Sequence, residues 1–252
     1  MWEKEETQHY VFHYHKHSLA EKDITSIMDL QERCFDYICR ILRVKMNKKI
    51  NYFLCESPEE VGKLYGDDEP SNGIVKYPDT VYAVYNEDVK CVGFHEDVHL
   101  IAYNTLGNPP QALLREGLAM FFDKVWWGIP NEAWVQVFLK TGLYKTISSL
   151  KDNREFFRYS ETLTYPISGA FVAYLISVFG TEKFKNFYKI VDDDFDKIFY
   201  LTFGHNLNDV EDNFLGYIQT VHYNETLQNL VLEYLKRAGF FQIKAIQEKQ
   251  GS

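Results

Sequence analysis

The sequence changes character near residue 90. Before that point, segments with strand-like alternation and segments with helical periodicity follow one another, whereas the rest of the chain has a helical pattern almost throughout. Helices are predicted near 88–104, 111–126, 130–140, 165–179, 181–190, 207–221 and 224–238. We therefore expect an α+β fold, in which an N-terminal α/β lobe with a small mixed sheet precedes a helical C-terminal lobe.

The first ninety residues predict strand, helix, strand, helix, strand and strand, in that order. Residues 23–42 carry apolar side chains at helical spacing. Ser57, Pro58 and Glu60 provide the N-cap, the first residue and the capping-box glutamate of a second helix. The strands are predicted by HYVFHYHKH, KINYFLC, GIVKY and TVYAVYN. We expect the last of these to lie nearest to the helix that follows and to offer an exposed edge.

The first predicted strand carries histidines opposite its aromatic residues, at His9, His13, His15 and His17. Histidines at alternate strand positions can bind a metal ion, and they also occur on the polar, solvent-facing side of a sheet. We expect the solvent-facing arrangement and keep the metal site as the alternative.

Composition limits the partners of the chain. The 252 residues are 46% hydrophobic and carry a net charge of −9, so no basic surface is available to neutralise nucleic-acid phosphates. We expect no transmembrane segment, and the acidic N-terminus has no apolar signal core. The chain as written is therefore expected in the cytoplasm, or outside it if a leader has been removed. No CxxC pair is present, and buried free thiols are expected at Cys34, Cys39, Cys55 and Cys91.

The segment FHEDVHLIAYN, residues 94–104, contains the motif HExxH on a predicted helix. Residues four apart on a helix are rotated by only about 40°, so His95 and His99 can share one zinc ion. Glu96 is rotated by about 100° from His95 and can serve as general base toward a water at the ion. The alternative is a surface helix that carries two histidines by chance.

A catalytic zinc ion needs a third protein ligand. Asn108 and Pro109 begin another predicted helix, whose apolar stripe surrounds the carboxylate of Glu116. A carboxylate in apolar surroundings needs a partner, which a zinc ion provides; an ion pair with Arg115 or another cation is the alternative. The 17 positions from His99 to Glu116 accommodate a turn and a returning helix, which favours Glu116 as the third ligand of one zinc per chain.

HEDVH followed by LLREGLAMFF resembles the gluzincin metallopeptidases of the peptidase MA-like group and, more distantly, the catalytic domain of aminopeptidase N-type enzymes. In that group HExxH precedes a helix with a glutamate ligand, often within Glu-Gly-x-Ala, as at residues 116–119 here. The segment YPISGAFVAYLISVFG is similar to the tyrosine-led helix of the same group. The resemblance therefore implies that the Tyr165 hydroxyl stabilises a tetrahedral intermediate; a packed aromatic is the alternative.

The resemblance also implies a zincin-like fold with the HExxH helix at the junction of two lobes, residues 1–125 and 126–252, in one catalytic unit. It implies hydrolysis of peptide bonds in a peptide or protein substrate. Asp97 departs from the family pattern, which favours an uncharged residue there. Its charge indicates either a wetter side of the helix or an orienting role. A zinc protein with weak or no catalysis, which binds peptides or a partner, is therefore the alternative function.

Overall fold

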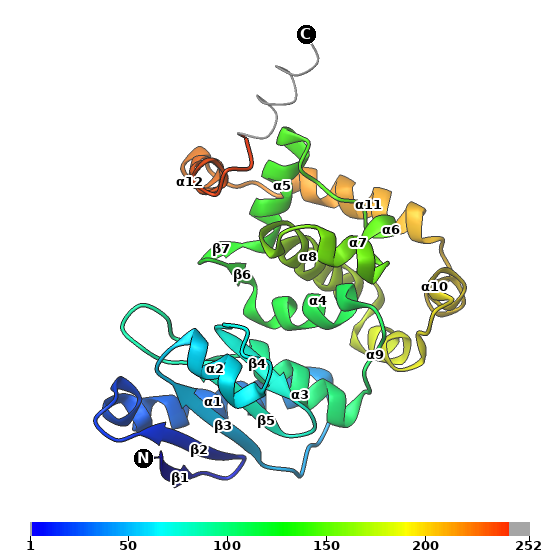
Figure 1. Cartoon of the computed structure of the whole chain (residues 1–252). Helices are drawn as coiled ribbons and strands as arrows, with labels where there is room; N and C mark the ends of the chain where they lie inside the picture. Colours follow the sequence, from blue (N-terminus) through cyan, green and yellow to red (C-terminus); the bar gives the residue numbers. More distant parts are fainter. Residues whose placement is uncertain (1, 242–252) are drawn as a thin grey trace. The chain divides into compact units, whose positions relative to one another are not determined.

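A mixed sheet with the strand order β1-β2-β3-β5-β4 forms the N-terminal part of the protein (Figure 1). The computed structural model describes residues 2–241 of the chain. β2 (Tyr10–His15), β3 (Ile50–Cys55) and β5 (Thr80–Val84) run parallel, whereas β1 (Trp2–Glu6) and β4 (Gly73–Lys76) pair antiparallel at the two edges. The four predicted strands are present and β1 is additional. The exposed edge predicted for TVYAVYN is wrong, because β5 lies between β3 and β4.

Helices cover both faces of this sheet. α1 (Leu19–Leu42) and α3 (His95–Thr105) pack on one face, and α2 (Pro58–Tyr65) packs against β4 and β5 on the other. The strand residues that face α1 and α3 form a core in which each is at most 1% exposed: Tyr10, Phe12, Tyr52, Leu54, Val81 and Ala83. This alternation confirms the one-sided aromatic pattern of the first predicted strand.

The opposite face of the sheet carries a smaller apolar cluster under α2, made of Cys55, Val61, Tyr82 and Val84. α2 begins as predicted, because Ser57 Oγ accepts a hydrogen bond from Glu60 N at 3.3 Å. Of the four cysteines, Cys34 and Cys55 are buried free thiols, as expected, whereas Cys39 and Cys91 are half-buried.

The strand histidines are not the predicted solvent-facing set. His15 Nε2 lies 2.5 Å from Glu60 Oε1 of α2, and the His13 ring stacks on Phe53 with centroids 4.2 Å apart. His9 Nδ1 lies 2.6 Å from Glu32 Oε2 of α1. Only His17 of this set is exposed. The prediction failed because α2 and Trp2 cover the side of the sheet that carries His13 and His15, and α1 covers His9.

The rest of the described chain is helical apart from one short hairpin, which confirms the predicted α+β class. Its helices are α4 (Ala112–Asp123), α5 (Asn131–Thr141), α6 (Ile147–Leu150), α7 (Asn153–Arg158), α8 (Glu161–Phe179), α9 (Thr181–Ile190), α10 (Phe195–Phe203), α11 (Leu207–Thr220) and α12 (Glu225–Arg237). α6, α7 and α10 lie outside the predicted helices. The hairpin pairs β6 (Val125–Trp126) with β7 (Ile129–Pro130).

The hairpin explains why α4 ends three residues before the predicted position. Trp127 and Gly128, the two residues between its strands, have φ values of 50° and 74°. Two successive residues with positive φ are what a type I′ turn requires, and that turn suits the twist of paired strands. Lys124 also has positive φ, and its N–H bonds to Met120 O, which closes the C-terminus of α4.

The chain divides into two compact units. The first comprises Met1–Pro110 and Ile176–Asp193, and the second comprises Gln111–Leu175 and the described residues from Asp194 onward. The predicted division into lobes 1–125 and 126–252 stays a prediction. It places the HExxH helix and the Glu116 helix in the same lobe because both carry motif residues. Among the residues described, α8 alone has the length and apolar composition of a membrane span, and 61% of that stretch is buried inside the protein. Such burial is common for a core helix of a globular protein.

Candidate metal centre

α3 places His95 and His99 one helical turn apart. The two imidazole rings lie with centroids 5.0 Å apart at an interplanar angle of 79°, and His99 is 9% exposed. The helix begins at His95 rather than near residue 88, because Gly93 has a φ of 130° and residues 88–94 form no helix. The first histidine of the motif is therefore also the first residue of the helix.

α4 carries Glu116 within a largely buried helix. Gly117 lies next to it, and a β-carbon there would stand 2.7 Å from Val172 Cγ2 and 2.9 Å from Ser168 O. Both neighbours belong to α8, so the glycine allows α4 to approach α8 closely. The helical setting predicted for Glu116 is confirmed, and close packing against α8 fixes the backbone from which its side chain extends.

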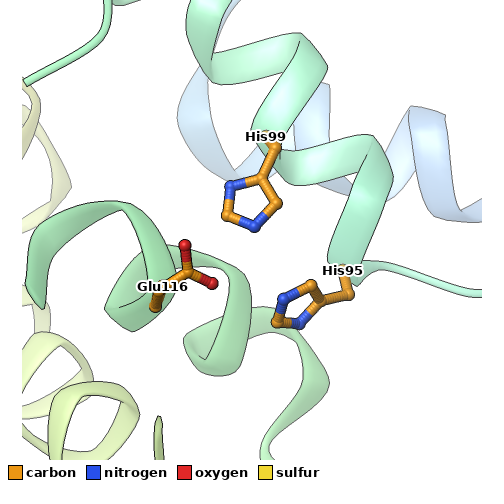
Figure 2. Close-up of side chains that lie close together, drawn as sticks. All are labelled: His95, His99 and Glu116. Atoms are coloured by element: carbon orange, nitrogen blue, oxygen red, sulfur yellow. The ribbon is translucent and has the colours of Figure 1, made fainter. Parts of the chain in front are cut away.

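His95, His99 and Glu116 together form a group that can hold a metal ion. One ligand atom from each residue lies within 4.8 Å of the others, and Figure 2 shows both rings and the carboxylate directed toward one another. Ligand atoms at about 2.1 Å from a tetrahedral zinc ion are separated by about 3.4 Å. Small side-chain rotations therefore suffice to bring the three donors to coordination distance. The residues fit the ion by their chemistry as well, since imidazole nitrogen and carboxylate oxygen are both zinc ligands.

No second group of this kind is present among residues 2–241. The strand histidines in particular contribute to none, because they lie against Glu32, Glu60 and Phe53 in separate places. The alternative of a metal site on the first strand therefore has no support in the described structure.

Glu96 follows the first histidine and is half-buried. Its carboxylate lies against β4, where a β-carbon added to Gly73 would stand 2.5 Å from Glu96 Oε1. The general-base role of Glu96 stays a prediction. No local pattern places Gly73 beside the carboxylate, since the two residues lie on different elements.

Asp97 is fully buried, so the wetter helix side that its charge suggested is wrong. Its Oδ2 accepts a hydrogen bond from Tyr10 Oη at 2.5 Å and another from Gln31 Nε2 at 2.9 Å. Burial raises the pKa of the Asp97 carboxyl well above its usual range, although both hydrogen bonds oppose that shift. Positions two apart on a helix differ by about 200°, so Asp97 points away from the face that carries the histidines.

Gln31 and Tyr10 are supporting residues that were not among the predicted site residues. Gln31 is fully buried on α1, at a position four residues after Ile27 and three before Cys34 in the apolar stripe of that helix. A polar residue inside an apolar stripe is the signal that could have identified it. Tyr10 had no such signal, because aromatic residues are common on the buried face of a strand.

Tyr165 lies on α8 and is half-buried. Its ring makes an edge contact with Trp126 of the hairpin, with centroids 5.3 Å apart, and a looser contact with Phe156 at 6.4 Å. These contacts fit the packed-aromatic alternative and leave the predicted role of its hydroxyl as a prediction.

Compared with known proteins, the chain matches no family model and no curated protein. The likeness to gluzincins therefore consists of the motif residues themselves. Of that likeness, the structure contains the part that concerns a metal: two histidines and a glutamate on helices, close enough to bind one ion.

Proposed function

We propose that the protein is a zinc-dependent metallopeptidase. The observation that carries the proposal is the convergence of two imidazole nitrogens and one carboxylate oxygen within 4.8 Å, with a glutamate directly after the first histidine. Three protein ligands of this kind are the set that catalytic zinc sites use, because a fourth position stays available for water. The order HExxH and then Glu-Gly-x-Ala supports peptide bonds as the target, through its resemblance to gluzincins.

Each residue of the proposed site has a distinct task. His95, His99 and Glu116 bind the ion and hold it in place. A zinc ion bound there would lower the pKa of a water toward about 7 and polarise the substrate carbonyl. Glu96 accepts a proton from the attacking water and delivers it to the leaving amine. The Tyr165 hydroxyl donates a hydrogen bond to the oxygen on which negative charge develops.

The alternative function, a zinc protein without effective catalysis, depended on Asp97. The carboxyl group at that position is buried against Tyr10 and Gln31, on the helix face opposite the histidines. Asp97 therefore has a structural explanation that does not disturb the reacting groups. We accordingly rank peptide hydrolysis first and keep peptide binding without hydrolysis as an outcome of the test.

The experiment begins with protein purified without added metal. We expect about one zinc per chain by elemental analysis, and loss of that zinc in His95→Ala, His99→Ala and Glu116→Ala. His222→Ala is the matched control, since His222 is exposed and lies outside the metal-binding group. Stoichiometric zinc in all three ligand variants would contradict the site.

Activity is then measured on a library of quenched fluorescent peptides. Hydrolysis should stop on chelation and return with zinc. Glu96→Gln should keep the zinc and lose the hydrolysis, because the amide cannot accept the proton. Zinc-loaded protein that binds peptides and cleaves none would select the alternative function, and cleavage that is insensitive to chelation would reject both.

A further inference from the structure

Gln31 makes three hydrogen bonds to the beginning of the metal-binding helix. Its Oε1 accepts from Gly93 N at 2.7 Å, and its Nε2 donates to Gly93 O at 3.1 Å and to Asp97 Oδ2 at 2.9 Å. A single side chain thus holds both backbone groups of the residue two positions before His95. A fully buried amide stabilises the fold most when all its groups are paired in this way, because an unpaired buried polar group lowers the free energy of unfolding.

The start of α3 has no capping side chain of its own. Phe94 occupies the N-cap position with helical backbone angles and makes no side-chain cap hydrogen bond. Helices whose N-cap lacks such a bond fray more readily at the first turn. In this helix the first turn contains His95, and the contacts of Gln31 with Gly93 and Asp97 hold the chain on both sides of that histidine.

Tyr10 completes the same network from the sheet. Its hydroxyl donates to Asp97 Oδ2 at 2.5 Å and lies 3.1 Å from Gln31 O, and both Tyr10 and Gln31 are fully buried. Residues of both β2 and α1 therefore hydrogen-bond to the α3 face opposite the histidines. Rotation of α3 by one residue would turn the imidazoles by about 100°, and these contacts oppose that rotation.

We infer that Gln31 is a positioning residue of the metal centre. It holds Gly93 and Asp97, and through them fixes the direction in which His95 and His99 present their nitrogens. The inference rests on the proposed function for the presence of the ion. It extends that function by assigning the orientation of the ligands to a residue that does not touch the ion.

The test compares metal binding in Gln31→Met and wild type. Methionine fills the same volume and makes none of the three hydrogen bonds. Cobalt replaces zinc as the probe, because the visible absorption of Co²⁺ reports the geometry of its ligands. Zn²⁺ has a filled d shell and no visible absorption of this kind. We expect Gln31→Met to bind cobalt about 10–100-fold more weakly, the usual range for a lost supporting partner, and to shift the cobalt spectrum. Tyr10→Phe, which keeps the ring and removes one donor, should change both readouts in the same direction by less.

The control separates positioning from a general loss of stability. Ile38→Val shortens a fully buried side chain of α1 that takes no part in the network. It should lower the melting temperature while leaving the cobalt affinity and spectrum as in wild type. Hydrogen exchange of residues 93–99 in metal-free protein should be faster in Gln31→Met than in Ile38→Val.

The outcomes distinguish the inference from the proposed function. Wild-type protein that binds no cobalt would overturn both. Wild-type binding, together with unchanged affinity and spectrum in Gln31→Met and Tyr10→Phe, would overturn the inference alone. If Gln31→Met does not fold, the comparison of Tyr10→Phe with Ile38→Val decides the question by the same two readouts.

Discussion

The carboxylate of Glu96 lies so close to Gly73 that a β-carbon at Gly73 would stand 2.5 Å from Glu96 Oε1 and 3.2 Å from Cδ. The obstructing atoms form the end of a flexible side chain, so Gly73→Ala should displace the carboxylate rather than unfold the protein. We expect normal zinc content and a fall in turnover of up to about 100-fold, because a misplaced base is far less effective. Steady-state kinetics and elemental analysis measure the two quantities.

Gly216→Ala is the matched control for this change. A β-carbon at Gly216 meets nothing within 4 Å, and the residue lies in α11 with ordinary φ. The substitution should raise helix stability by roughly 0.5–1 kcal/mol and leave turnover unchanged. Equal turnover in Gly73→Ala and wild type would show that the position of Glu96 against β4 does not matter for the reaction.

The site and much of the fold could be predicted from local patterns. The apolar period identifies α1, alternation identifies β2, and Ser57 identifies the start of α2. HExxH places two histidines on one helix face by geometry alone. A carboxylate in an apolar helix then indicates a third candidate ligand, because it needs a partner.

The features that could not be predicted depend on contacts between distant parts of the chain. Asp97 bonds to residues 66 and 87 positions away, so its burial leaves no local trace. β1 is rich in charged residues and is a strand because it pairs with β2. The short hairpin after α4 depends on positive φ at Trp127, a residue type for which that backbone conformation is unusual.

Metal removal should lower thermal stability. The ion binds the native protein far better than the unfolded chain, so it contributes about 2.7 kcal/mol when free zinc is 100-fold above Kd. For a chain of this size that corresponds to a shift in Tm of roughly 5–10 °C. Differential scanning fluorimetry before and after chelation measures the shift, and added zinc should reverse it. In His99→Ala the same chelation should have no effect, and a wild-type curve that is indifferent to verified zinc removal would contradict the prediction.

His13 should make the fold sensitive to mild acid. Its ring stacks on Phe53, its Nε2 is buried without a hydrogen-bond partner, and burial lowers the pKa of the imidazole below the usual 6.5. The unfolded chain then binds the proton more readily, so the stability from neutral His13 is complete above pH 6.5 and falls as the pH drops toward the folded pKa.

His13→Phe removes this titration and keeps an aromatic ring against Phe53. The free energy of unfolding of the variant minus that of wild type should become larger as the pH is lowered from 7.5 to 5. Guanidinium titrations measure both values. The contributions of other groups largely cancel in that difference, which makes it the quantity to compare. A difference that is constant over this range would mean that His13 has no lowered pKa in the folded protein.

Tyr165→Phe tests whether the hydroxyl on α8 takes part in the reaction. Phenylalanine keeps the ring contacts with Trp126 and Phe156, so fold and zinc content should be unchanged. Loss of one donor to a developing oxyanion lowers turnover by about 10²–10³, and KM should change much less because the contact is strongest in the transition state. Tyr174→Phe makes the same chemical change on the same helix, where the ring packs on Phe214 and Tyr217, and should leave turnover intact. If the two variants are equally active, Tyr165 is a packed aromatic only, and the oxyanion donor has to be sought at another residue.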